Sequence, residues 1–170
     1  MIVETGEPTP PPPALRPGAD ARALFNPAFL AALIGRAAAG HRTDRDAPMP
    51  LVLGYLVAPT VLHTPTREAL PRANARLAKW ADEHQLLRAE LRWRAPQLTE
   101  ITHRGLRFGI RHELIALTPH GIEAAAALAR LRAPSDGDAA ECWKAAELLG
   151  RWLPRAGPPA TVFALLGLRP

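Results

Sequence analysis

The stretch LVLGYLVAPTVLHTPTREALP, residues 51–71, is the most apolar run of the 170-residue chain, and the rest of the fold is expected to form around it. Its apolar part, Leu51–Leu62, is too short for a membrane-spanning helix, which needs about 20 apolar residues. We therefore expect a buried segment, in which Pro59 would kink a helix or restrict a strand to a sheet edge. The stretch does not separate helix from strand, but a kinked helix is favoured because Pro50 fits its first position.

The composition is that of a basic globular protein. Hydrophobic residues make up 48% of the chain, and the formal net charge is +5 at pH 7. A chain of this length can bury its own core, and a basic balance favours an acidic protein surface, nucleic acid or an anionic membrane as partner. The single cysteine, Cys142, excludes an internal disulfide and indicates a reducing compartment. Because neither a secretory signal nor a membrane span is apparent, we expect a cytoplasmic protein that does not enter a membrane.

The chain divides into an arm and a domain. Residues 1–22 contain GEPTPPPPALRPG, whose prolines favour an extended, polyproline-like conformation. This flexible arm is either a disordered tail or a docking segment that becomes ordered on a partner. Residues 23–170 are expected to form a single helical domain, because apolar residues recur there at helical spacing.

Capping residues, prolines and glycines delimit the expected helices. The first has Asn26 as its N-cap and Pro27 at its first position, and ends at Gly40. LIAL, Leu114–Leu117, is a candidate strand. The fold class is therefore mainly α: a compact helical domain, related in layout to a helix-turn-helix, with at most a short strand pair. The other expected helices are 64–71 with Thr64 as cap, 72–93 ended by Pro96, 97–113, 122–131 opened by Thr118-Pro119, 139–153 with Asp138 as cap, and 159–166.

No pattern typical of catalysis is apparent. The chain lacks a Gly-rich phosphate loop, a GxSxG elbow and an HExxH motif. Its six histidines are scattered, whereas a structural zinc site needs four Cys or His ligands, so no metal or cofactor is expected. Cys142 lies beside Trp143 on an apolar helix face, where an inert buried thiol is expected. We therefore expect a protein that is not an enzyme.

Three arginines, Arg104, Arg107 and Arg111, line one face of the expected helix 97–113. This helix follows another and precedes the apolar LIAL piece, which is similar to a helix-turn-helix layout. In that interpretation the arginines contact DNA phosphates or base edges. The alternative is a solvated basic face. The expected helix after Thr118-Pro119 leaves no second strand for a wing, which weakens the DNA interpretation.

The C-terminal stretch stays apolar to the last residues. Because chain ends usually fray, such a terminus is expected to dock, either onto the protein's own core or into a groove of a partner. A second candidate surface is the corner that follows the central apolar stretch. The candidate partner-binding residues at these two surfaces are His63, Thr64, Arg67, Trp152, Phe163 and Leu165.

Three stretches together resemble the middle component of bacterial three-component ABC systems. They are LFNPAFLAALI (24–34), LVAPTVLHTPTREALP (56–71) and KAAELLGRWLPRAGPPATVFALLGLRP (144–170). The resemblance begins at about Leu24, excludes the proline-rich arm, and is most specific in the last stretch. The segment between Leu114 and Asp138 is shorter than in the family, which usually carries a Gly-rich hairpin there.

The resemblance implies a non-catalytic adaptor. It would link an ABC ATPase of the chromosome-maintenance and DNA-repair type to a third, recognition or effector component, in a system that acts against phages and other mobile DNA. No catalytic residue or cofactor is implied, DNA would be reached directly or through the ATPase, and self-association stays open. The alternative, from the residues alone, is a DNA-binding regulator or DNA-contacting subunit that uses the arginine-rich helix.

Overall fold

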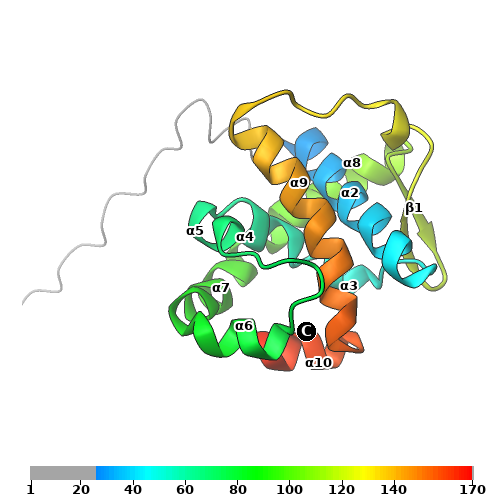
Figure 1. The fold of residues 1–170 in the computed structure, drawn as a ribbon. Helices are drawn as coiled ribbons and strands as arrows, with labels where there is room; N and C mark the ends of the chain where they lie inside the picture. The colour runs from blue at the N-terminus through cyan, green and yellow to red at the C-terminus, as the bar shows by residue number, and fades with distance from the viewer. Residues whose placement is uncertain (1–25, 170) are drawn as a thin grey trace, which may run out of the picture.

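A long helix, α2 (Pro27–Arg45), runs through the middle of the computed structural model, which describes residues 26–169 (Figure 1). The proline-rich arm and Pro170 lie outside the described residues. As predicted, the Asn26 side chain caps α2 by accepting a hydrogen bond from the Ala28 amide at 2.9 Å. The helix does not end at Gly40 but continues to Arg45, because Gly40 faces another helix and a side chain there would overlap the Glu147 carbonyl.

That neighbouring helix is α9 (Gly137–Trp152), which packs along α2 and forms the centre of the core with it (Figure 1). A second glycine, Gly150, lies against the Ala37 carbonyl of α2, so the two backbones approach closely at two points. The predicted apolar face of this helix is confirmed, since these residues are buried: Cys142, Trp143, Ala146, Leu149 and Leu153.

The central stretch forms three short helices, α3 (Leu51–Gly54), α4 (Val57–Val61) and α5 (Thr64–Glu68), and not one helix kinked at a proline. The break falls between α3 and α4, while Pro59 lies inside α4. Proline, which has no amide hydrogen, is tolerated there because the amides in the first turn of a helix have no intrahelical partners. Every residue of α4 is buried, as expected for the segment around which the fold forms.

The predicted helix 72–93 is two helices, α6 (Leu77–Glu83) and α7 (Gln85–Gln97), because the chain bends at His84. Pro96 does not end the second helix but lies one residue before its end. The next helix is α8 (Thr99–Arg111). Its buried residues are Thr102, Gly105, Leu106 and Gly109, and the two glycines bring α8 close to its neighbours, including α2.

The segment after α8 is an antiparallel hairpin of β1 (Ile115–Thr118) and β2 (Gly121–Ala124). The candidate strand at LIAL is confirmed, but the helix expected over 122–131 is wrong: β2 occupies its first residues, and the 3-10 turn η1 (Leu128–Arg130) follows. Ile122 exchanges both backbone hydrogen bonds with Met49, at 2.9 and 2.8 Å, and is fully buried. These long-range contacts outweigh the helix propensity of the alanines that follow.

The C-terminal stretch folds back onto the protein's own core, which is the first of the two alternatives for its docking. The 3-10 turn η2 (Leu153–Ala156) leads into α10 (Pro159–Leu166), which ends at Gly167 with φ 70°. Val162, Phe163 and Leu166 are buried against the core, and α10 lies beside α6 (Figure 1). The predicted fold class, mainly helical with one short strand pair, is confirmed. Among the described residues, no helix combines the length and apolar character needed to cross a bilayer.

Candidate partner-binding site

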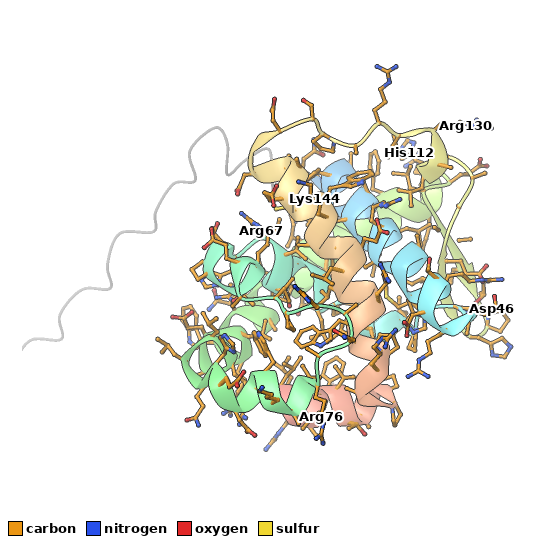
Figure 2. The ribbon with its side chains drawn as sticks, viewed as in Figure 1. Asp46, Arg67, Arg76, His112, Arg130 and Lys144 are labelled. Carbon is orange, nitrogen blue, oxygen red and sulfur yellow. The ribbon has the colours of Figure 1, made fainter. Side chains whose placement is uncertain are left out.

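Arg67, predicted as a surface residue of the corner, is instead an internal connector between α5, α4 and α9. Its side chain is 6% exposed, and it lies where α5 faces α9 (Figure 2). Nη1 donates a hydrogen bond to the Val61 carbonyl at 2.8 Å and lies 3.2 Å from Cys142 Sγ, while Nη2 pairs with the Asp138 carboxylate. Because its donors are engaged inside the protein, Arg67 stabilises the corner and has little surface left for a partner.

Cys142 is held in the same interior cluster. Burial raises the pKa of its thiol to about 11, and this outweighs the opposing effect of the Arg67 charge. The thiol is therefore protonated at neutral pH, donating to the Val61 carbonyl at 3.5 Å. A protonated, buried thiol is a poor nucleophile, in agreement with the inert role predicted for this residue.

His63, not Thr64, caps α5. Its Nδ1 accepts from the Thr66 amide at 3.3 Å and lies 2.7 Å from the Thr66 hydroxyl, and its Nε2 lies 3.8 Å from the Glu90 carboxylate. Burial lowers the pKa of His63 from its ordinary value of 6.5, with a further lowering by the Arg94 charge that Glu90 partly offsets. A neutral imidazole whose Nδ1 accepts and whose Nε2 carries the proton toward Glu90 fits this environment.

This pKa shift predicts a pH dependence of stability. Since the folded state lowers the pKa of His63, the unfolded chain binds the proton more readily, and the free energy of unfolding decreases as pH falls through 6.5 toward the folded pKa. We expect the urea midpoint to fall between pH 7.5 and 5. His63→Asn, which keeps a capping acceptor that does not titrate, should reduce the decrease. A smaller decrease should remain in this variant, because burial also lowers the pKa of His41. An unchanged pH profile in this variant would contradict the prediction.

Arg94 supports the corner from α7. Its Nε donates to the Pro59 carbonyl at 3.0 Å and its Nη2 to the Thr66 hydroxyl at 3.1 Å, so the chain of contacts continues from α7 through Thr66 to the His63 ring. Burial lowers the pKa of Arg94, although a guanidinium remains charged at any physiological pH. The side chains of the corner are therefore held in place by backbone carbonyls and by one another.

A large aromatic side chain completes the site. Trp93 is 74% exposed and lines an open hollow together with His63, Glu90 and Arg94. We call the five residues His63, Thr64, Glu90, Trp93 and Arg94 the His63 corner. Trp93 was not predicted as a site residue, because the expected helix ended at this position. Its place between Arg92 and Arg94 was a signal that could have identified it.

The remaining predicted residues lie elsewhere. Trp152 and Phe163 belong to the core, with 2% and 6% exposure, and Trp152 Nε1 donates to the Ala75 carbonyl at 2.9 Å. Leu165 is half-buried on α10, and Thr64 is exposed at the start of α5. Direct contact of Thr64 and Leu165 with a partner therefore stays a prediction. Trp152 and Phe163 stabilise the fold.

The three arginines of α8 are exposed on its outer side. Arg104 donates to Glu100 at 3.0 Å, whereas Arg107 and Arg111 form no ion pair within residues 26–169. The hairpin that follows α8 supplies the second strand that the sequence did not indicate. In the described part of the chain no group of His, Cys, Asp and Glu gathers in a way that could hold a metal ion.

Residues 19–170 match the family described as ABC-three component (ABC-3C) system Middle Component 3. The chain belongs to this family. As a Middle Component 3 protein it is a component of a multi-component ABC system. The hairpin between Leu114 and Asp138 forms with strands of four residues, although this segment is shorter than in the family and a helix was expected after Thr118-Pro119. No curated protein and no solved structure matches the chain significantly.

Proposed function

We propose that this protein is a non-catalytic cytoplasmic adaptor that links an ABC ATPase to a third, recognition or effector component in a system directed against phages and other mobile DNA. Its membership in a family of middle components supports a binding role. The observation that carries the proposal is the position of Trp93, a large aromatic side chain left in solvent on the outer face of α7.

The outer face of α7 has the spacing of a docking helix. Leu86, Ala89 and Trp93 follow one another at i, i+3 and i+7, all are exposed, and Leu86 and Trp93 are 72% and 74% exposed. Amphipathic helices that dock into a partner present anchors at this spacing. Tryptophan and arginine dominate the binding energy of many interfaces, especially when polar groups surround them. Trp93 beside His63, Glu90 and Arg94 has that composition.

Replacing Trp93 by alanine tests this surface. We expect the affinity for the ABC ATPase or the third component to fall about 30-fold or more, because an aromatic hot spot contributes at least about 2 kcal/mol. The melting temperature should not change, since the side chain packs little against the domain. The measurement is co-purification of the tagged chain with the components encoded beside it, followed by titration of the purified partners.

Leu131→Ala is the matched control, because this exposed apolar residue, 42% exposed, follows η1 and lies outside the His63 corner. It should leave affinity unchanged. Wild-type affinity in the Trp93→Ala variant would reject the His63 corner as the binding surface. Absence of the ATPase and the third component from wild-type preparations would reject the adaptor function itself.

DNA binding through α8 is a second candidate function, favoured by the hairpin that follows this helix. A helix with exposed arginines next to a two-stranded hairpin has the elements of a winged-helix domain. If Arg104, Arg107 and Arg111 contact phosphates, replacing all three by alanine should remove most of the affinity and lower the salt slope by about 3. Fluorescence anisotropy with duplex DNA at several salt concentrations measures both.

A matched triple variant at Arg88, Arg92 and Arg151, which form no ion pair in the described structure, controls for the loss of net charge. It should bind DNA nearly as well as the wild-type protein. Equal losses in the two triple variants would indicate unspecific attraction to a basic protein, and salt-independent binding would reject phosphate contacts.

A further inference from the structure

A second apolar surface shares no lining residue with the His63 corner. It is a hollow of about 380 Å³ between α3, α10 and the junction of α7 with α8. Val52 and Tyr55 form one wall, Phe163 and Leu168 another, and Pro96 the third. Tyr55 and His103 meet edge to face, with ring centroids 5.3 Å apart. Because α10 is docked on the core, this hollow is a preformed part of the fold.

The apolar surface continues past Val52. A second hollow lies on its other side and is lined by Leu51, Leu117 and the hairpin turn at Pro119 and His120. Val52 lines both hollows, so they are neighbours on the surface, and we call the two together the Val52 groove. Leu51 and Val52 are each 38% exposed and Leu117 is 59% exposed. Large apolar side chains gathered at the surface in this way mark binding sites more often than chance.

The charges around the Val52 groove indicate what would occupy it. Among the described residues, no aspartate or glutamate lines either hollow, and the basic side chains there are His103, His120 and Arg169. Burial raises the pKa of Tyr55, so its phenol remains a neutral donor. The groove therefore presents apolar walls with donors and a cation at its edges, which complements apolar side chains accompanied by carboxylates.

We propose that the Val52 groove binds an acidic segment of a partner component that carries two apolar side chains, one for each hollow. This inference rests on the proposed adaptor function and adds to it a second binding surface and the chemistry of its ligand. A protein segment fits better than a nucleic acid, because a phosphate backbone offers nothing to the apolar walls. It fits better than a bilayer, because the apolar residues line a concave groove rather than a protruding surface.

The test replaces Val52 in the full-length protein by two charged residues of opposite sign. Val52 lies in the first turn of α3 and is already partly exposed, so both variants should fold. Val52→Glu places a negative charge where carboxylates are expected to bind, and should weaken binding to the purified partner component about 30-fold or more. Val52→Lys loses the same apolar contact but attracts the ligand, and should bind within about 5-fold of the wild-type protein.

A probe that needs no partner is 8-anilinonaphthalene-1-sulfonate, which combines an apolar ring system with a negative charge. Its fluorescence should rise with the wild-type protein and with Val52→Lys, and much less with Val52→Glu. Equal fluorescence in all three proteins would overturn the assignment of charge to the groove.

A photocrosslinker placed at Leu117, the most exposed apolar residue of the groove, identifies the occupant in the reconstituted complex. Crosslinking to an acidic, apolar segment of the ATPase or the third component supports the proposal. Crosslinking to a basic segment, or only to residues 1–25 of this chain, overturns it. If the complex forms, requires Trp93 and tolerates Val52→Glu, the adaptor function stands and this inference fails. If no complex forms with the wild-type protein, the adaptor function fails first.

Discussion

Replacing Gly150 by alanine is expected to destabilise the domain more than any other single methyl addition considered. A Cβ at this position would overlap the carbonyl group of Ala37, so the new methyl group on α9 would collide with the backbone of α2. Backbone atoms inside two long packed helices cannot move aside as a flexible side chain does. Overpacking of ordinary cores costs about 1–3 kcal/mol, and we expect at least about 3 kcal/mol here.

The reciprocal contact makes the loss difficult to absorb. Gly40 of α2 faces the Glu147 carbonyl of α9, so the helices are in close contact on both sides of their crossing. A shift that relieves Gly150→Ala would disturb this second contact. Because domains are stable by only about 5–15 kcal/mol, we expect the urea midpoint of the variant to fall strongly, with partial loss of helical circular dichroism at 37 °C.

Gly54→Ala is the matched control, because it adds the same methyl group to a buried helical glycine. The nearest atoms there are side-chain carbons of Ile122 and Ile34, at 3.4 and 3.7 Å, which is ordinary contact. Since alanine is favoured over glycine in helices by up to about 1 kcal/mol, this variant should be as stable as the wild-type protein or slightly more stable. If Gly150→Ala unfolds at the wild-type urea concentration, α2 and α9 do not cross as described.

Local signals allowed part of the fold to be predicted from the sequence. The Asn26 cap and the apolar face of α9 depend on residues within a few positions of one another, and both are confirmed. The end of α2 and the hairpin were missed because they depend on distant partners. Gly40 continues the helix because α9 is adjacent, and Ile122 pairs with Met49, on the other side of α8 in the sequence.

For the candidate site, the sequence indicated a corner after the central apolar stretch, and partner binding there stays a prediction. His63 and Thr64 do lie at a surface corner, as proline and threonine spacing indicated. The sequence did not show that Arg67 would be buried, because its carboxylate partner Asp138 is 71 residues away. Nor did it show that Trp93 would remain in solvent, since an amphipathic pattern does not reveal which aromatic residue the core leaves out.

Replacing Arg67 by methionine is expected to cause the second large loss of stability. Methionine preserves most of the volume but leaves the Asp138 carboxylate without this donor and the Val61 carbonyl with only the more distant thiol of Cys142. Breaking a buried ion pair by removing one partner costs about 3–5 kcal/mol. We expect the lower part of that range, because the Asp138 side chain is 52% exposed and can be hydrated. Chemical denaturation monitored by tryptophan fluorescence measures the loss.

Two further variants separate the possible causes of this loss. Lys144→Met removes an exposed ion pair of the same helix, with Glu141 at 2.9 Å, and should leave the urea midpoint unchanged because exposed pairs contribute little. Asp138→Asn retains an acceptor for Arg67 and should cost less than Arg67→Met. If Asp138→Asn is as destabilising as Arg67→Met, the ion pair itself holds α5 to α9. If it is nearly neutral, the loss in Arg67→Met comes mainly from the hydrogen bond to the Val61 carbonyl, and Arg67 stabilises the His63 corner mainly through α4.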